Sequence, residues 1–126
     1  MLTKSEAEVM HVLWSVDTPL TSTEIVNLSV GASWKKTYVN LLVNSLLEKK
    51  MIEIAGVKQT GRNYSRTFRP IVQKEEYFVD CITDNKDFSE EHIPLMFCAL
   101  IKHTKNKEIF KKLREIIDKA DEEANE

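Results

Sequence analysis

The sequence has few of the residues that form cofactor, metal or disulfide sites. Its three glycines are too few to assemble a glycine-rich loop around the phosphates of a nucleotide. Its two cysteines, Cys81 and Cys98, cannot form a disulfide framework, and we expect them to be small buried side chains in a reducing compartment. These shortages argue against a nucleotide-dependent enzyme and against a disulfide-rich secreted protein.

Catalytic and metal-binding patterns are also missing. The three histidines, His11, His92 and His103, have no spacing that converges on a metal ion. The sequence contains no HExxH motif, no CxxC motif and no recognisable Ser/His/Asp arrangement. It therefore predicts no enzyme, with no catalytic residue, no metal ligand and no cofactor.

Long apolar segments are absent as well. The longest uninterrupted apolar run is Leu95–Ile101, seven residues, whereas a helix needs ~20 to cross a bilayer. Glu6 and Glu8 interrupt any signal-peptide pattern near the N-terminus. With 42% hydrophobic and 30% charged residues, the composition is typical of a soluble globular domain. We therefore expect a cytoplasmic protein without membrane insertion.

The charge is unevenly distributed along the chain. The net charge is −2, but residues 1–70 hold nine basic against six acidic residues, and residues 71–126 hold nine against fourteen. Within residues 35–69 the only acidic residues are Glu48 and Glu53, against eight basic ones. The basic residues are Lys35, Lys36, Lys49, Lys50, Lys58, Arg62, Arg66 and Arg69. A basic surface on a mildly acidic protein is typical of contact with nucleic-acid phosphates, although a solvated lysine-rich surface has the same composition.

Three helices are predicted in the first fifty residues. Thr3–Glu6 and Thr21–Glu24 both fit a capping box, in which a threonine and a glutamate three residues later cap the start of a helix. Gly31 ends the second helix, and Ser33 caps a third, which covers residues 34–50. One arc of this third helix is apolar and consists of Val39, Leu42, Val43 and Leu46.

A two-stranded ribbon follows. Residues 51–55 and 63–69 alternate between apolar and polar side chains, and Gly56–Gly61 lies between them, with a glycine at each shoulder of a hairpin. Pro70 ends the ribbon. Three helices and then a ribbon is the order of a winged helix-turn-helix, so we expect a fold that is mainly α with a small β-hairpin. Residues 1–70 would be its DNA-binding domain.

The third helix and the wing, residues 56–62, are the predicted DNA-binding elements. A helix-turn-helix places its second helix in the major groove, and the cations of a wing suit the DNA backbone. The predicted contacts are Lys35, Lys36, Thr37, Tyr38, Leu41, Asn44, Ser45, Lys58, Arg62 and Arg66. Alternatively, Leu41 and Trp34 cover neighbouring side chains, or Tyr38 and Leu41 belong to a winged-helix module that binds another protein.

Residues 71–126 are predicted to form three helices, 71–83, 92–103 and 107–123, the last capped by Asn106. So short a unit rarely buries many large apolar side chains. If they stayed exposed to water, the protein would lose on the order of 20–30 kcal/mol of hydrophobic stabilisation. We expect a homodimerisation region that presents two recognition helices to an inverted repeat, although a cap on the same chain's winged domain would also bury them. The predicted interface residues are Phe78, Ile82, Met96, Phe97, Leu100, Ile109, Phe110, Leu113, Ile116 and Ile117.

The order and spacing of several short motifs resemble the penicillinase-repressor family, which also contains copper-responsive repressors. The matching residues are Leu2-Thr3, Glu6-Ala7-Glu8-Val9-Met10, Leu13-Trp14, Leu20-Thr21, Glu24-Ile25, Trp34, Leu46, Lys49, Ile52, Gly61-Arg62 and Phe68-Arg69-Pro70. The resemblance covers residues 2–70 well and the rest by architecture. It implies a dimeric winged-helix repressor of transcription, and as a partner a membrane sensor protease whose signal leads to cleavage of the repressor.

The sequence also departs from the family pattern. Tyr38, Leu41 and Ser45 stand where the family usually has Thr, Thr and Arg, so the operator would differ. Cys98-Ala99 falls where the family has its Asn-Phe cleavage pair. The Cys-x-Cys metal motif of the copper repressors is missing, which argues against copper sensing.

Overall fold

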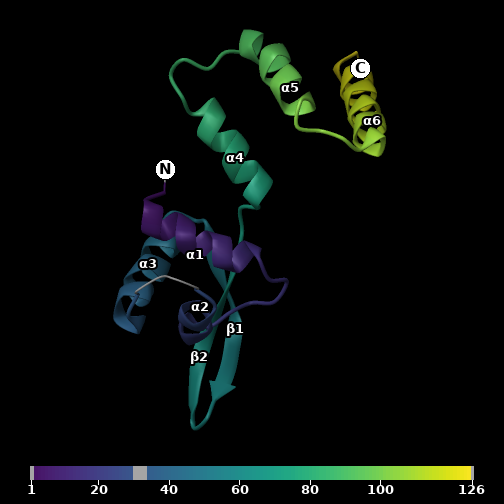
Figure 1. The fold of residues 1–126 in the computed structure, drawn as a ribbon. Helices are drawn as coiled ribbons and strands as arrows, with labels where there is room; N and C mark the ends of the chain where they lie inside the picture. The colour runs from purple at the N-terminus through teal and green to yellow at the C-terminus, as the bar shows by residue number, and fades with distance from the viewer. Residues whose placement is uncertain (1, 30–33, 126) are drawn as a thin grey trace. The chain divides into compact units, whose positions relative to one another are not determined.

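The computed structural model describes residues 2–29 and 34–125 and confirms a mainly α-helical winged helix-turn-helix (Figure 1). The expected positions of Gly31 and Ser33 lie outside the described residues. In chain order the elements are α1 (Lys4–Trp14), α2 (Ser22–Leu28), α3 (Lys36–Glu48), β1 (Ile52–Thr60), β2 (Asn63–Pro70), α4 (Lys74–Thr83), the 3-10 helix η1 (Glu90–His92), α5 (Ile93–Ile101) and α6 (Lys107–Ala124). The chain forms two compact units, Met1–Asn85 and Lys86–Glu126.

Both predicted capping boxes are confirmed. At α1 the Thr3 hydroxyl accepts from the N–H of Glu6 over 3.2 Å, and the Glu6 carboxylate accepts from the N–H of Thr3 over 2.8 Å. At α2 the same exchange joins Thr21 and Glu24, over 3.2 and 3.0 Å. Each box satisfies backbone N–H groups that the first turn of a helix leaves without intrahelical partners.

The hydrophobic core of the first unit lies between the three helices and the ribbon. The predicted apolar arc of α3 is buried, and α1 and α2 contribute the residues that face it. Phe68 of β2 and Leu20 exchange two backbone hydrogen bonds of 2.8 and 3.0 Å, which tie the ribbon to the segment before α2. The buried apolar residues are Val9, Met10, Leu13, Leu20, Ile25, Val39, Leu42, Val43, Leu46, Met51, Ile52 and Phe68.

α3 ends in a hydrogen-bonded cap that requires a left-handed residue. The N–H of Met51 donates to the carbonyl of Leu46 over 3.0 Å, and the N–H of Lys50 donates to that of Leu47 over 3.1 Å. This pattern is a Schellman motif, and it holds Lys50 at a φ of 59°. Glycine usually fills this position because a Cβ crowds the backbone there. The cap turns the chain from α3 into β1.

The wing comprises both strands, β1 and β2, and is a longer ribbon than the sequence predicted. β1 and β2 pair from Ile52 opposite Pro70 to Thr60 opposite Asn63. The prediction that Gly56–Gly61 forms a loop was wrong, because β1 continues through these residues. A shift in register next to Gly56 places it at a bulge, which lets the strand absorb a residue without ending.

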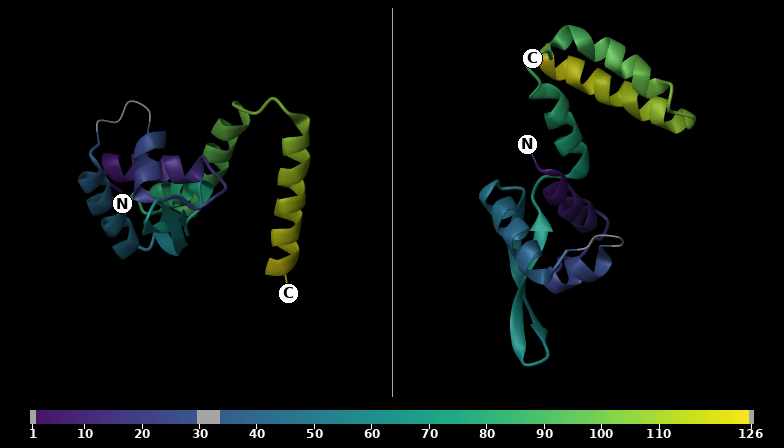
Figure 2. Two further views of the ribbon diagram at one scale, coloured as in Figure 1. Left: turned by 90° about the horizontal axis from the view of Figure 1, so that it is seen from below. Right: turned by 60° about the vertical axis from the view of Figure 1, so that its left-hand side comes forward.

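The turn of the hairpin contains only Gly61 and Arg62. Gly61 has a φ of 65°, the left-handed conformation that two-residue hairpin turns favour. The hairpin projects beyond α1–α3 in Figure 1 and in the right panel of Figure 2. Arg62 therefore lies at the tip, as predicted, whereas Lys58 lies within β1.

α4 belongs to the first unit rather than to the helices that follow it. The indole N–H of Trp14 donates to the carbonyl of Val72 over 2.9 Å, just before α4 begins. The Trp14 ring centroid lies 5.7 Å from that of Tyr77 and 6.5 Å from that of Phe78. The compact unit therefore continues beyond Pro70, where the sequence predicted the end of the DNA-binding region.

The second unit has no buried core. Every described residue of this unit is at least partly exposed, including the apolar side chains of α5 and α6. The predicted cap of α6 is confirmed, because the Asn106 side chain accepts from the N–H of Glu108 over 3.0 Å. The expectation of buried cysteines was wrong: Cys98 is exposed in α5 and Cys81 is half-buried in α4. None of the described helices is both long enough and apolar enough to span a bilayer.

Candidate nucleic-acid interface

One face of α3 is exposed and polar, opposite its buried arc. Lys36, Asn40 and Asn44 follow one another at four-residue intervals along this face, with Thr37 and Leu41 beside them, and all five are exposed. Leu41 is 66% exposed and so does not cover neighbouring side chains, whereas Trp34 is half-buried and packs against the core. Amide and hydroxyl groups on an exposed helix face can hydrogen-bond base edges in a major groove.

Two residues predicted to read bases lie off this face. Tyr38 is 44% exposed and lies at the edge of the helix surface. Ser45 is half-buried, and its hydroxyl donates to the carboxylate of Glu6 over 2.6 Å. The sequence predicted a DNA contact at Ser45, but the place of this residue on the helix turns its side chain toward α1. Its proton is committed to a carboxylate of the same chain.

The Glu6 carboxylate joins α1 to α3. Its side chain is only 2% exposed, and it accepts hydrogen bonds from Lys49 over 2.7 Å as well as from Ser45 and from the N–H of Thr3. Burial alone would raise the pKa of this carboxyl, but the hydrogen bonds outweigh burial and lower the pKa to about 2. A charged, fully bonded anchor of this kind fixes the direction in which the exposed face of α3 points.

A polar cleft joins α3 to the wing and to the start of α2. Its volume is about 200 Å³. It is lined by Ser22, Thr23, Lys36, Asn40, Ser65, Arg66 and Phe68. Lys36 and Arg66 come from different elements, and the cleft brings them to one surface together with three hydroxyl groups. Two cations and several hydroxyls are the groups that contact phosphate oxygens in protein–DNA complexes.

The wing cations have different surroundings. Arg66 lies over the ring of Phe68, with its guanidinium carbon 5.4 Å from the ring centroid, which orients the side chain along the ribbon. Arg62 is exposed at the turn. The ammonium group of Lys58 binds the Glu24 carboxylate on α2 over 2.9 Å. That hydrogen bond, together with the one from the Thr21 backbone, lowers the pKa of Glu24.

The available basic surface is narrower than the sequence indicated. Besides Lys58, two of the eight basic residues of this segment are bound to carboxylates: Lys49 to Glu6 and Arg69 to Glu53, over 2.6 Å in the second pair. Lys35 precedes α3 as its N-cap residue and is exposed. These three cations are neutralised by carboxylates of the same chain, so fewer basic side chains are available to contact DNA than the sequence suggests.

Four polar residues of the cleft were not predicted from the sequence. Asn40 lies one turn after Lys36 and one turn before Asn44, so the helical period could have identified it. Ser22, Thr23 and Ser65 reach the cleft only because α2 and the wing fold against α3, and no local pattern indicates this. Among the described residues, no group of three or more His, Cys, Asp or Glu side chains is arranged to bind a metal.

The predicted dimer-interface residues fall in both units. Phe78 and Ile82 are exposed on α4 in the first unit. The remaining eight lie on α5 and α6, where Leu100, Ile109, Ile116 and Ile117 are exposed and Met96, Phe97, Phe110 and Leu113 are half-buried. These helices therefore keep a large apolar surface in contact with solvent within one chain.

Comparison with known proteins gives three findings. A family model described as penicillinase repressor matches residues 2–119. No curated protein matches the chain at a significant level. Among solved structures, the crystal structure of AF1382 from Archaeoglobus fulgidus is 20% identical, covers 70% of this chain and 94% of that chain, and has a TM-score of 0.40.

Proposed function

The chain belongs to the penicillinase-repressor family, and we propose that it represses transcription as a homodimer bound to an inverted-repeat DNA operator. Members of this family are DNA-binding regulators and not enzymes. The observation that carries the proposal is the cleft in which Lys36 of α3 and Arg66 of the wing share one surface beside the exposed face of α3. A single DNA duplex can contact both elements at such a surface.

In this proposal α3 occupies the major groove. The amides of Asn40 and Asn44 can make paired hydrogen bonds to adenine, and the Thr37 hydroxyl can bond to several bases. Leu41 can contact a thymine methyl group, which suits an exposed apolar side chain in the middle of the polar face.

Phosphate contacts complete the proposed interface. Lys35 and Lys36 at the start of α3, Arg66 beside the cleft and Arg62 at the wing tip would neutralise phosphates and release counterions. Lys58 has a different proposed role, because Glu24 already holds its ammonium group. It would fix the wing against α2 and so keep Arg62 and Arg66 in position.

The homodimer is proposed from the apolar surface of the second unit. The exposed side chains of α5 and α6 have no core of their own to enter, and a second copy of the same helices would bury them. Two-fold symmetry would then present two copies of α3 to two half-sites. A membrane sensor protease remains a predicted partner from the family resemblance alone, as does the cytoplasmic location.

The proposal is tested by selecting duplexes from a randomised pool with the full-length protein. We expect enrichment of an inverted repeat whose half-sites are centred about one helical turn, 10–10.5 base pairs, or a multiple of it apart. Recovery of unrelated sequences with no repeat would contradict the proposal.

A second candidate function is a winged-helix module that binds another protein through Tyr38 and Leu41. The exposure of both side chains favours it. The two functions differ in what removal of positive charge does. Lys36→Ala and Arg62→Ala would weaken DNA retention if the chain is a repressor and would leave it unchanged if the face binds a protein.

A further inference from the structure

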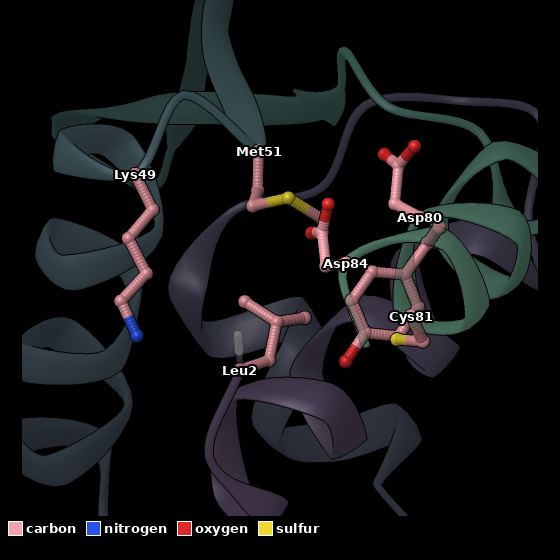
Figure 3. A pocket seen from close by; sticks show the side chains of 7 residues that line it. Leu2, Lys49, Met51, Asp80, Cys81 and Asp84 are labelled. Carbon is pink, nitrogen blue, oxygen red and sulfur yellow. The ribbon is translucent and has the colours of Figure 1, made fainter. Parts of the chain in front are cut away.

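A second cavity lies where α4 approaches the start of α1 and the end of α3 (Figure 3). Its volume is about 290 Å³, near the lower end of the range for small-molecule sites. All its lining residues belong to the first compact unit, and none of them lines the cleft beside the wing. The cavity is therefore separate from the surface proposed to contact DNA.

The floor of this cavity is apolar. Met51 is 9% exposed and Leu2 is half-buried. In Figure 3 these two side chains lie between Lys49 on one side and the α4 residues Asp80 and Cys81 on the other. A ligand in the cavity would thus rest a hydrocarbon portion on Met51 and Leu2.

The rim of the cavity carries negative charge. Asp80 lies in the last turn of α4, and Asp84, four residues later, is its C-cap residue with a helical backbone, so both residues lie on the same side of the helix end. Within residues 2–29 and 34–125, no cation forms an ion pair with either carboxylate. Among the described lining residues the one cation is Lys49, which is bound to Glu6 over 2.7 Å, so its charge is already balanced.

We propose that this cavity binds a small organic ammonium ion, with the ammonium group between Asp80 and Asp84 and the hydrocarbon portion against Met51 and Leu2. A bare metal cation would leave the apolar floor without a partner, and an organic anion would be repelled by the two carboxylates. The bound ligand would connect α4 to α1 and α3. This site does not depend on the proposed DNA-binding function.

Trp14 provides a reporter for occupancy. Its ring contacts Tyr77, a lining residue of the cavity, at 5.7 Å between centroids, and its indole N–H donates to Val72 at the entry to α4. A ligand that connects α4 to the rest of the unit changes the surroundings of this indole group. The indole N–H signal therefore reports binding without DNA.

The test is a titration of the ¹⁵N-labelled full-length protein with phenethylamine, followed by NMR at constant ionic strength. We expect the Trp14 indole signal and the backbone signals of Asp80 and Cys81 to shift together and to saturate, with a Kd in the millimolar range or tighter. The neutral analogue 2-phenylethanol should bind about tenfold more weakly or worse, and 3-phenylpropionate should not bind.

Variants locate the site. The double variant Asp80→Asn/Asp84→Asn should weaken phenethylamine binding about tenfold or more, whereas Glu75→Gln, on the opposite side of α4, should leave it unchanged. The same spectra verify that each variant is folded. Equal affinity for the alcohol, preference for the anion, shifts that do not saturate, or shifts that persist in the double variant would each overturn the proposal.

Discussion

The carboxylate of Glu6 and the ammonium group of Lys49, 2.7 Å apart, join the first turn of α1 to the end of α3. Glu24 and Lys58 repeat this relationship between α2 and the wing, over 2.9 Å. Both glutamates are the third residue of a helix that begins with a capping box. Each carboxylate therefore caps its own helix and also binds a lysine from a later element, so local capping and tertiary orientation depend on the same side chain.

Glu6 makes folding stability dependent on pH in acid. Its pKa is lowered from 4.5 to about 2 in the folded protein, so the stabilisation is fully present above the unfolded-state pKa. It is lost as the pH falls from about 5 to about 2, and its size is about 2–3 kcal/mol. Urea denaturation of the natural protein at a series of pH values should show this loss as a slope of the free energy of unfolding against pH.

Glu6→Gln should remove most of that slope and lower the stability at pH 7 by about 2–3 kcal/mol, because Lys49 and Ser45 lose their charged acceptor. Glu8→Gln removes a carboxylate from the same helix and serves as the control, with the slope retained. An unchanged slope in Glu6→Gln would show that the carboxylate does not anchor α1 to α3.

The left-handed conformation of Lys50 predicts a stabilising substitution. Lys50→Gly should raise the free energy of unfolding by about 0.5–1 kcal/mol, because glycine adopts a φ of 59° without the crowding that a Cβ causes. Lys50→Ala keeps the Cβ and removes the rest of the side chain with its charge, so it should not reproduce the gain. Equal stability of the two variants in chemical denaturation would contradict the cap assigned to the end of α3.

The elements that local patterns define could be predicted from the sequence. The two capping boxes, the apolar arc of α3 and the Asn106 cap depend on residues two to seven positions apart, and the structure confirms them. The error at Gly56 arose because a bulge can carry a strand through glycine, which strand alternation cannot reveal.

The interface was predicted less completely, because its residues meet only through tertiary contacts. The Ser45 hydroxyl could in principle bond to a base. In the fold it donates instead to the carboxylate of Glu6, in the first turn of α1. Lys58 and Arg69 appear as free cations in the sequence and bind carboxylates in the fold. The cleft residues Ser22 and Ser65 are more than forty positions apart in the sequence, and no periodicity connects them.

The Glu24–Lys58 pair predicts how the wing is held. Lys58→Met should weaken DNA binding while leaving its salt dependence unchanged, because the lost contact lies within the protein and not with a phosphate. Glu24→Gln, which removes the partner carboxylate, should weaken binding similarly. Fluorescence anisotropy across a salt series makes the distinction, and a salt slope reduced by about 1 in Lys58→Met would identify Lys58 as a phosphate contact instead.

The apolar surface of α5 and α6 predicts a dimer that a single charge can disrupt. Leu100 and Ile116 are 66% and 63% exposed within one chain, so Leu100→Lys and Ile116→Lys should shift the full-length protein toward monomer in sedimentation equilibrium. Val57→Lys places the same charge at an equally exposed position of the wing, 69%, and should leave the dimer intact. If the natural protein sediments as a monomer, the proposed two-fold symmetric homodimer is contradicted.

The salt dependence of operator binding tests the central claim most directly. We expect the logarithm of the binding constant to fall linearly with the logarithm of salt concentration, and Lys36→Ala and Arg66→Ala each to reduce that slope by about 1. Lys74→Ala, an exposed lysine of α4, should keep the full slope. Binding that is indifferent to salt, or identical slopes for all three variants, would contradict a DNA surface formed by α3 and the wing.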